Sequence, residues 1–199
     1  MNRLFALILI LITGQVLAQE PQSQNIRTAI FAGGCFWCME PPFDQLDGVL
    51  ETTSGYSGGH VKNPTYDQVS AGGTGHAEVV QVKYDADKVS YAQLLDVFWR
   101  NVDPLDAGGQ FCDRGDQYRS AIFYGSPEEK RLAEASKQQV AAKLGKPIVT
   151  EVQPAATFYP AEQYHQNYYQ RNPVRYKYYR YRCGRDQRLE EVWGSAPAH

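Results

Sequence analysis

The sequence predicts an α+β fold, a two-layer sandwich in which helices pack on a mixed β-sheet. Segments with strand-like alternation recur along the chain, and segments whose apolar residues have helical spacing separate them. Their order is close to β-α-β-β-α-β-α-β. Residues 19–199 are numerous enough for one domain with its own core, and no repeat, linker or low-complexity segment divides them.

The N-terminus has the pattern of a secretory signal peptide. One positive charge precedes the apolar run 4–12, and Val16 and Ala18 fit the cleavage-site rule. The run is shorter than the ~20 residues of a membrane span. We therefore expect residues 1–18 to be a signal peptide, residues 19–199 to form the mature protein, and the product to be exported, periplasmic or secreted, without stable membrane association. An uncleaved anchor is the alternative.

The charge balance bears on the partners. The chain has 20 Lys and Arg residues against 22 Asp and Glu residues, a net charge of −2. This argues against a general attraction to nucleic acid or to an anionic membrane. Residues 163–185 lack acids and interleave Arg with Tyr, a composition that also occurs on nucleic-acid surfaces. We expect instead a C-terminal tail that clasps the domain, a small or peptide substrate, and no nucleic-acid binding.

The first predicted strand, residues 28–31, leads into a glycine turn and a helix. Gly33 and Gly34 allow a tight turn, and Cys35 then lies at or next to the N-terminus of the helix. Unpaired N–H groups and the positive end of the helix dipole favour a thiolate there, and the thiolate is the nucleophilic form of cysteine. The alternative is that Cys35 and Cys38 are a buried structural pair.

Capping signals define two of the predicted helices. Ser90 and Gln93 form a capping box, and Ser126 is an N-cap followed by Pro127 at the first helical position. Gly145 ends the second of these helices. The other elements follow from periodicity and turn residues. In order, the chain predicts a strand at 48–56, a helical turn at 67–70, a strand at 76–84, a helix at 90–101, a strand at 120–124, a helix at 126–144, a strand at 148–152 and a helix at 160–172.

The strand predicted at 76–84 carries an acidic residue on an apolar face. Glu78 shares that face with Val80 and Val82, because side chains two apart in a strand point the same way. If the face is covered, burial raises the pKa of the carboxyl and keeps it protonated near neutral pH, as a hydrogen-bond donor or general acid. A strand-end glutamate paired with a lysine is the alternative.

Five segments, in one order along the chain, resemble the signatures of a known family. They are Gly34-Cys35-Phe36-Trp37, Ser54 to Gly59, Asn63 to Tyr66, Thr74 to Glu78 and Gln117 to Ser120. The chain resembles the A-type peptide methionine sulfoxide reductases over most of residues 28–185. The resemblance implies a ferredoxin-like mixed β-sheet core in a single catalytic domain. It also implies an enzyme that reduces the S epimer of methionine sulfoxide, free or in proteins, without a cofactor and with a thioredoxin-like reductant. We expect a monomer.

The family's chemistry assigns roles to the matching positions. By resemblance, Cys35 attacks the sulfoxide sulfur and becomes a sulfenic acid, while Glu78 protonates the oxygen. The hydroxyls of Tyr66 and Tyr118 assist, and Asp113 matches an acidic residue beside the site. The residues expected to bind the substrate are Gly34, Phe36, Trp37 and His165. A histidine within a predicted helix is more often structural, which is the alternative for the last of these.

A second thiol must condense with the sulfenic acid to form a disulfide. Cys38 stands where the family commonly has glycine, and Cys183 is alone near the C-terminus, where many relatives carry two cysteines. We predict that Cys183 resolves the sulfenic acid, with Cys38 as the alternative or as a relay, and we derive no role for Cys112. Two rival functions are a thioredoxin-type disulfide oxidoreductase that uses Cys35 with Cys38, and an aromatic-lined peptide-binding module with two structural disulfides.

Overall fold

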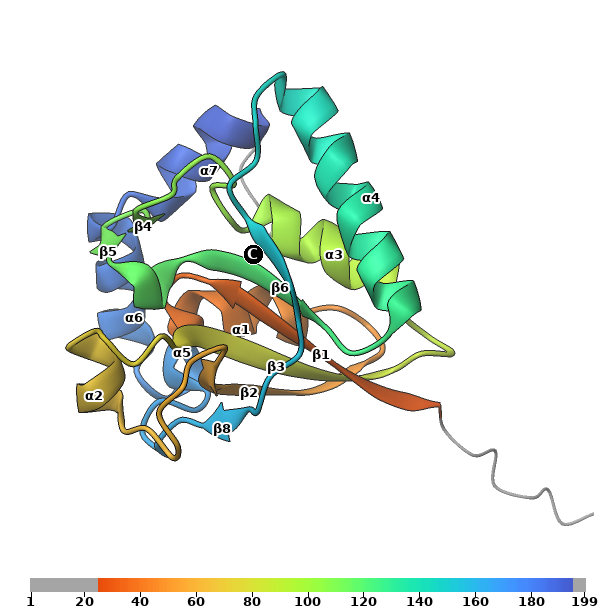
Figure 1. Cartoon of the computed structure of the whole chain (residues 1–199). Helices are drawn as coiled ribbons and strands as arrows, with labels where there is room; N and C mark the ends of the chain where they lie inside the picture. Colours follow the sequence, from red (N-terminus) through yellow and green to blue (C-terminus); the bar gives the residue numbers. More distant parts are fainter. Residues whose placement is uncertain (1–24, 195–199) are drawn as a thin grey trace, which may run out of the picture.

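A six-stranded sheet forms the centre of the molecule (Figure 1). The computed structural model describes residues 25–194, so the predicted signal peptide lies outside the described residues. The strand order is β7-β6-β1-β3-β2-β8, and every neighbouring pair is antiparallel except the parallel pair of β6 and β7. The strands are β1 (Ile26–Gly33), β2 (Val49–Ser57), β3 (Ala77–Asp85), β6 (Ser120–Tyr124), β7 (Glu151–Pro154) and β8 (Tyr159–Pro160).

Helices and a small ribbon complete the fold. The ribbon is the antiparallel pair β4 (Gly109–Gln110) and β5 (Asp113–Arg114), which leads into the short 3-10 helix η1 (Asp116–Tyr118). The helices are α1 (Phe36–Asp44), α2 (Tyr66–Ser70), α3 (Tyr91–Arg100), α4 (Pro127–Leu144), α5 (Tyr168–Arg171), α6 (Pro173–Arg182) and α7 (Arg185–Trp193). The order β1-α1-β2-β3-α3-β6-α4-β7 is the predicted one, and the mixed sheet with packed helices confirms the α+β fold class.

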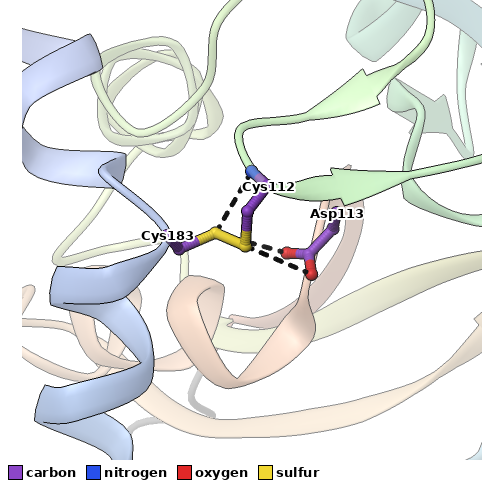
Figure 2. Close-up of side chains that lie close together, drawn as sticks. All are labelled: Cys112, Asp113 and Cys183. Carbon is purple, nitrogen blue, oxygen red and sulfur yellow. Dashed lines mark hydrogen bonds between the residues drawn. A yellow bond between two sulfur atoms is a disulfide. The ribbon is translucent and has the colours of Figure 1, made fainter.

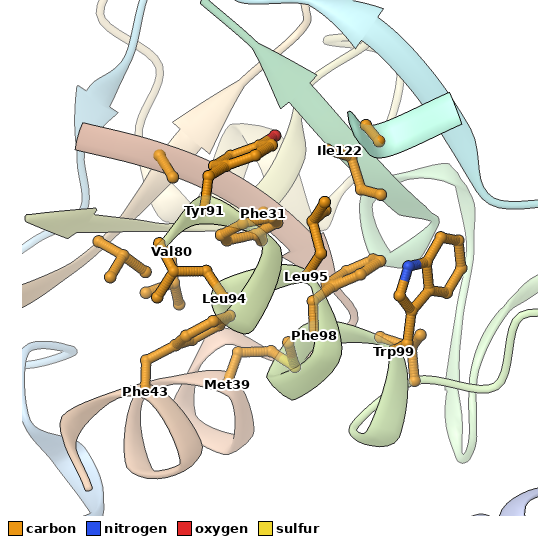
Figure 3. Packing of buried hydrophobic residues seen from close by; sticks show 14 of the residues in the cluster. Phe31, Met39, Phe43, Val80, Tyr91, Leu94, Leu95, Phe98, Trp99 and Ile122 are labelled. Carbon is orange, nitrogen blue, oxygen red and sulfur yellow. The ribbon is translucent and has the colours of Figure 1, made fainter. Parts of the chain in front are cut away.

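The main hydrophobic core lies between the sheet and helices α1 and α3 (Figure 3). Phe31 in the central strand β1 is fully buried and stacks on Phe43 of α1 and Phe98 of α3, with ring centroids 5.1 and 5.3 Å apart. Because side chains alternate along β1, its neighbours Ile30 and Ala32 belong to a second, smaller cluster on the other face. The sheet is therefore buried on both faces, which fixes the strand that leads into Cys35.

The two capped helices begin where the sequence predicts. Ser90 and Gln93 form a capping box at the start of α3, and Ser126 accepts a hydrogen bond from the Glu129 amide at the start of α4. Gly145 ends α4 in the left-handed conformation. These boundaries were predictable because each depends on contacts within a few residues of the chain.

The segment that follows residue 160 differs from its prediction. The helix expected at 160–172 is only α5, which begins after Asn167 in the left-handed conformation at φ 52°. The expected extended tail is instead two helices, α6 and α7, separated by the left-handed Gly184 at φ 66°. Their low apolar content hid them, because the helical positions are occupied by Arg, Lys and Tyr rather than by an aliphatic stripe. Among residues 25–194, no helix combines the length and the apolar character that a membrane crossing requires.

Candidate active site

The turn between β1 and α1 presents Cys35. Gly34 has φ 81°, a conformation that favours glycine, and a Cβ at this position would lie 2.6 Å from the Gln110 Cβ. Cys35 is the N-cap residue of α1, and the Cys38 amide donates to the Cys35 carbonyl at 3.0 Å. The first helical turn therefore brings the two cysteines to one side of α1. Gly34 is required for this turn by its backbone conformation and by the lack of space.

The two free thiols, Cys35 and Cys38, are buried and share a hydrogen bond. Burial, and then this bond, raise the pKa of Cys35 well above its ordinary value. The same bond lowers the pKa of Cys38 to about 6, against the opposing effect of burial. The interaction within the substrate-free pair therefore favours the proton on Cys35 and the negative charge on Cys38. Burial of the Cys35 thiol thus opposes the effect of the helix N-terminus, which by itself favours a thiolate.

Glu78 reaches the same helix N-terminus from β3. Its Oε2 accepts a hydrogen bond from the Phe36 amide at 3.0 Å, and only 2% of the residue is exposed. Burial raises the pKa of Glu78 to about 8, although the bond from Phe36 opposes the shift. The carboxyl is therefore mostly protonated at neutral pH, as the strand alternation predicts for a covered face. The structure does not show the alternative, a strand-end glutamate paired with a lysine.

Two phenols face this carboxyl. Tyr66 begins α2, where its amide donates to Glu162 at 2.8 Å, and Tyr118 is the last residue of η1. Burial and then the Glu78 charge raise the pKa of Tyr66 to about 12, and the same two causes raise that of Tyr118 still further. Both hydroxyls therefore keep their protons and are available as donors beside the thiol.

An aromatic wall adjoins the two cysteines. The Trp37 indole stacks on Tyr168 with ring centroids 3.8 Å apart, and its Nε1 donates to His165 Nδ1 at 3.0 Å. The His165 ring also contacts Phe36 at 5.0 Å and Tyr66 at 4.4 Å. Because His165 Nδ1 accepts a bond, the imidazole is neutral with its proton on Nε2, and burial lowers its pKa. The structure thus brings His165 to the predicted substrate-binding residues, although it lies outside any helix.

The other two cysteines form a disulfide beside Asp113 (Figure 2). Cys112, from the β4–β5 ribbon, is bonded to Cys183 at the end of α6. Asp113 Oδ1 lies 3.7 Å from the Cys112 sulfur, and Oδ2 accepts a hydrogen bond from the Tyr179 hydroxyl. Burial raises the pKa of Asp113. Among residues 25–194, the ligand atoms of Cys112, Asp113 and Cys183 have a spacing suited to a metal ion, but both sulfurs are used by the disulfide.

The disulfide revises the predicted pairing of cysteines. Cys183, the predicted resolving thiol, is bonded to Cys112, for which the sequence indicated no role. Cys38, the alternative, lies in hydrogen-bond contact with Cys35. The sequence could not show this, because 71 residues separate the disulfide partners. Sequence reasoning also missed Tyr168 and Tyr179, which form part of the aromatic wall; their only signal was the high tyrosine content of the C-terminal segment.

A buried thiol pair, a protonated carboxyl and an aromatic wall define the class of protein as a thiol-dependent oxidoreductase. The family described as "Peptide methionine sulfoxide reductase" matches residues 27–197. The chain belongs to this family and is an enzyme that reduces methionine sulfoxide. Of the two rival functions, neither the disulfide oxidoreductase nor the peptide-binding module agrees with this membership.

Relatives of known name agree over most of the chain. The "Peptide methionine sulfoxide reductase MsrA 2" of Rhizobium meliloti is 54% identical over 177 residues, which cover 89% of this chain and 86% of the relative. The MsrA of Bacillus subtilis is 50% identical over 175 residues, covering 87% and 99%. Among solved structures, Mxr1 from Saccharomyces cerevisiae in reduced form has a TM-score of 0.72 at 31% identity, covering 80% of this chain and 92% of that one. Methionine sulfoxide reductase A of Corynebacterium diphtheriae has a TM-score of 0.68 at 32% identity, covering 80% and 81%.

Proposed function

We propose that Cys35 is the nucleophile for the S epimer of methionine sulfoxide and that Glu78 is the general acid. The hydrogen bond from the Phe36 amide to Glu78 carries this proposal. It holds a protonated carboxyl at the helix N-terminus that presents the Cys35 thiol. Cys35 keeps 7% of its surface exposed, whereas Cys38 keeps 1%. Of the two sulfurs, Cys35 is therefore the one that a substrate reaches.

In the first step, the Cys35 sulfur bonds to the sulfoxide sulfur. The thiol proton of Cys35 passes along the hydrogen bond to Cys38. Glu78 gives its proton to the sulfoxide oxygen, and Tyr66 and Tyr118 donate hydrogen bonds to that oxygen. The hydroxyl is transferred to Cys35, which becomes a sulfenic acid, and methionine leaves. The substrate sulfur is reduced by two electrons and the Cys35 sulfur is oxidised by two.

The aromatic wall positions the substrate. Phe36 and Trp37 offer apolar surface to the methyl group, and the bond from Trp37 to His165 fixes the indole plane. Gly34 permits the backbone turn that presents the thiol. Asp113 adds a carboxyl between the wall and the exposed disulfide, held by the Tyr179 hydroxyl. These groups bind and orient the substrate while Cys35 and Glu78 perform the chemistry.

In the second step, Cys38 resolves the sulfenic acid. Its sulfur attacks the Cys35 sulfur, the S–O bond breaks, and the Cys38 proton leaves with the hydroxyl as water. Glu78 regains its proton from solvent. The products are a Cys35–Cys38 disulfide and one water molecule. The position of both cysteines on one helical turn, and the interaction between their thiols, support this assignment.

We infer that Cys112 and Cys183 pass electrons from the reductant to the buried pair. In reduced form, this dithiol exchanges with the Cys35–Cys38 disulfide, which restores two buried thiols and leaves a Cys112–Cys183 disulfide. The structure holds that combination of oxidised and reduced pairs. Cys112 is exposed, so an external thioredoxin-like dithiol has access to it. Asp113 and Tyr179 lie beside the disulfide, and we propose that α6, which carries Tyr179, moves during the exchange.

The sequence pattern of residues 1–18 supports export, and we propose that the mature enzyme begins at Gln19 and works as a monomer outside the cytoplasm. N-terminal sequencing of the protein from fractionated cells tests the cleavage position. Protein that still begins at Met1 and is found in the cytoplasmic fraction would contradict the proposed cleavage and export. Sedimentation of the purified enzyme tests the monomer.

The proposed chemistry is tested with separate S and R epimers of a methionine sulfoxide peptide, without an external reductant, on enzyme whose Cys35 and Cys38 are free thiols and whose Cys112–Cys183 disulfide is intact. We expect methionine from the S epimer alone, and a Cys35–Cys38 crosslink in the digest of this enzyme. Consumption of both epimers would contradict the specificity. A crosslink from Cys35 to Cys183 would contradict the assignment of Cys38.

A further inference from the structure

Arg185, the first residue of α7, is a buried cation. The residue is 1% exposed and is among the largest fully buried side chains of the described chain. Its Nη2 donates to the carbonyls of Gly33 at 3.1 Å and Asn101 at 2.6 Å, and lies 3.0 Å from the Met39 sulfur. The guanidinium carbon lies 4.4 Å from the centroid of the Phe111 ring. Carbonyls, a thioether and an aromatic face therefore surround the charge.

Within residues 25–194, Arg185 forms no salt bridge with a carboxylate. A guanidinium carries a permanent positive charge, and burying a charge is costly unless a negative group compensates it. Carbonyl dipoles satisfy some of its donors, but its Nε is buried without a partner. A negatively charged group near Arg185, other than a carboxylate, is therefore to be expected.

The thiol pair is that source. Gly33 and Met39, which bind the Arg185 guanidinium, flank the turn that carries Cys35 and Cys38. The Nη1 atom lies 3.7 Å from the position that a Cβ would occupy at Gly34. The Arg185 charge lowers the pKa of Cys38, after the larger effect of the bond from Cys35. The cation and the buried negative charge thus lie on the two sides of one helical turn.

The other charged groups near Cys38 do not replace Arg185. Arg180 of α6 also acts on Cys38, but it is paired with Asp186. Asp113 of β5 acts in the opposite direction. The remaining titratable groups near the pair are Glu78 of β3, Tyr66 of α2, Tyr118 of η1, and Tyr176 and Tyr179 of α6. None of them is a cation, and burial keeps Glu78 and the tyrosines protonated.

We propose that Arg185 is a positioning residue of the reaction, a fixed cation that stabilises the negative charge shared by Cys35 and Cys38 and favours its location on Cys38. The proposal rests on the resolving role of Cys38 given above. Its consequence is that α7 is a part of the active site. The Cys112–Cys183 disulfide and the Gly184 turn hold the backbone directly before this residue, which fixes where the guanidinium enters the core.

The test is a pH titration of thiolate absorbance in the full-length protein with the Cys112–Cys183 disulfide intact. In the wild type, the thiolate should appear with a midpoint near 6. Arg185→Gln keeps an amide donor for the carbonyls of Gly33 and Asn101 but removes the charge. We expect its midpoint to rise by ~1 unit or more, and that of Arg185→Met to rise likewise. Arg185→Lys restores the charge and should return the midpoint towards the wild-type value.

Arg188→Gln is the matched control. Arg188 lies one turn further along α7, and its charge is paired with Asp103 and Glu191. Its removal should leave the midpoint unchanged. A cooperatively folded Arg185→Gln or Arg185→Met protein with the wild-type midpoint would overturn the proposal. Loss of the low-pH thiolate absorbance in Cys38→Ser assigns the thiolate to Cys38. This assignment does not depend on turnover, so a failure of the resolving role of Cys38 can be distinguished from a failure of the role of Arg185.

Discussion

The two cysteine pairs have opposite environments. Cys35 and Cys38 lie on one helical turn, are buried, and carry free thiols under the influence of a neutral carboxyl and a buried cation. Cys112 and Cys183 come from elements 71 residues apart, lie partly in solvent, and are joined as a disulfide. The comparison teaches that burial separates two tasks. The buried pair can attack a sulfoxide without losing its intermediate to other thiols, while the accessible pair can meet a reductant.

Loss of the Cys35 sulfur should have the largest effect. Cys35→Ser replaces a thiol by a hydroxyl, which supplies no thiolate at neutral pH, so methionine release should be abolished. The measurement is methionine formed from a sulfoxide peptide by the reduced variant. Cys112→Ser is the control and should still release its first methionine. Substantial release by Cys35→Ser would show that the buried pair is not the reacting one.

Removal of the Glu78 proton should have the next largest effect. Glu78→Gln keeps the shape and the acceptor for the Phe36 amide but has no acidic proton, so the rate of the first methionine release should fall by ~10² to 10⁴. Thermal unfolding of the variant serves as the control for folding. A wild-type rate in a folded variant would remove Glu78 from the chemistry.

A pair of serine variants compares the two regions directly. Cys38→Ser should release the first methionine but accumulate the Cys35 sulfenic acid, so steady-state turnover with a thioredoxin-like donor should fall by ~10-fold or more. Cys183→Ser should form the Cys35–Cys38 disulfide at the normal rate but stall there, because the exposed dithiol that reduces this disulfide is missing. Trapping of the sulfenic acid by a dione reagent and mass spectrometry distinguishes the two. The reverse pattern would restore Cys183 as the resolving thiol.

The pH dependence of the first step should be a small effect near neutral pH, and its decline at higher pH should come from Glu78 beside the buried pair. The pKa of Glu78 is raised to about 8, so its protonated fraction falls as the pH rises through that value. The rate of the first methionine release should therefore decline about tenfold per pH unit above 8. Glu78→Gln should lack this decline. A wild-type rate that is flat or rising up to pH 10 would contradict a protonated Glu78.

The sequence was informative where local rules decide. The alternation around Glu78 predicted a buried, protonated carboxyl, and the glycine turn predicted Cys35 at the start of a helix. Both depend on residues within a few positions of one another. The Cys112–Cys183 bond and the burial of Arg185 depend on how α6 and α7 return to the ribbon and to β1, which no local pattern of the chain encodes.

The shift of negative charge from Cys35 to Cys38 was not predictable for a related reason. A helix N-terminus favours a thiolate in any helix, but the opposing effect of burial depends on the side chains that cover it. Here Tyr168 and Tyr176 pack against Cys38 from the C-terminal segment. The positions of these two tyrosines follow from the tertiary fold. The sequence predicted instead that the segment which carries them is a tail over the domain.

The central claim is that the buried pair reacts and the exposed pair supplies its electrons. Counting the methionine released per enzyme without external reductant tests it most directly. Enzyme with all four thiols reduced should release two methionines and end with both disulfides, whereas enzyme that starts with the Cys112–Cys183 disulfide intact should release one. Cys183→Ser, fully reduced, should also release one. A count of one from the fully reduced wild type, with Cys112 and Cys183 still free, would contradict the claim.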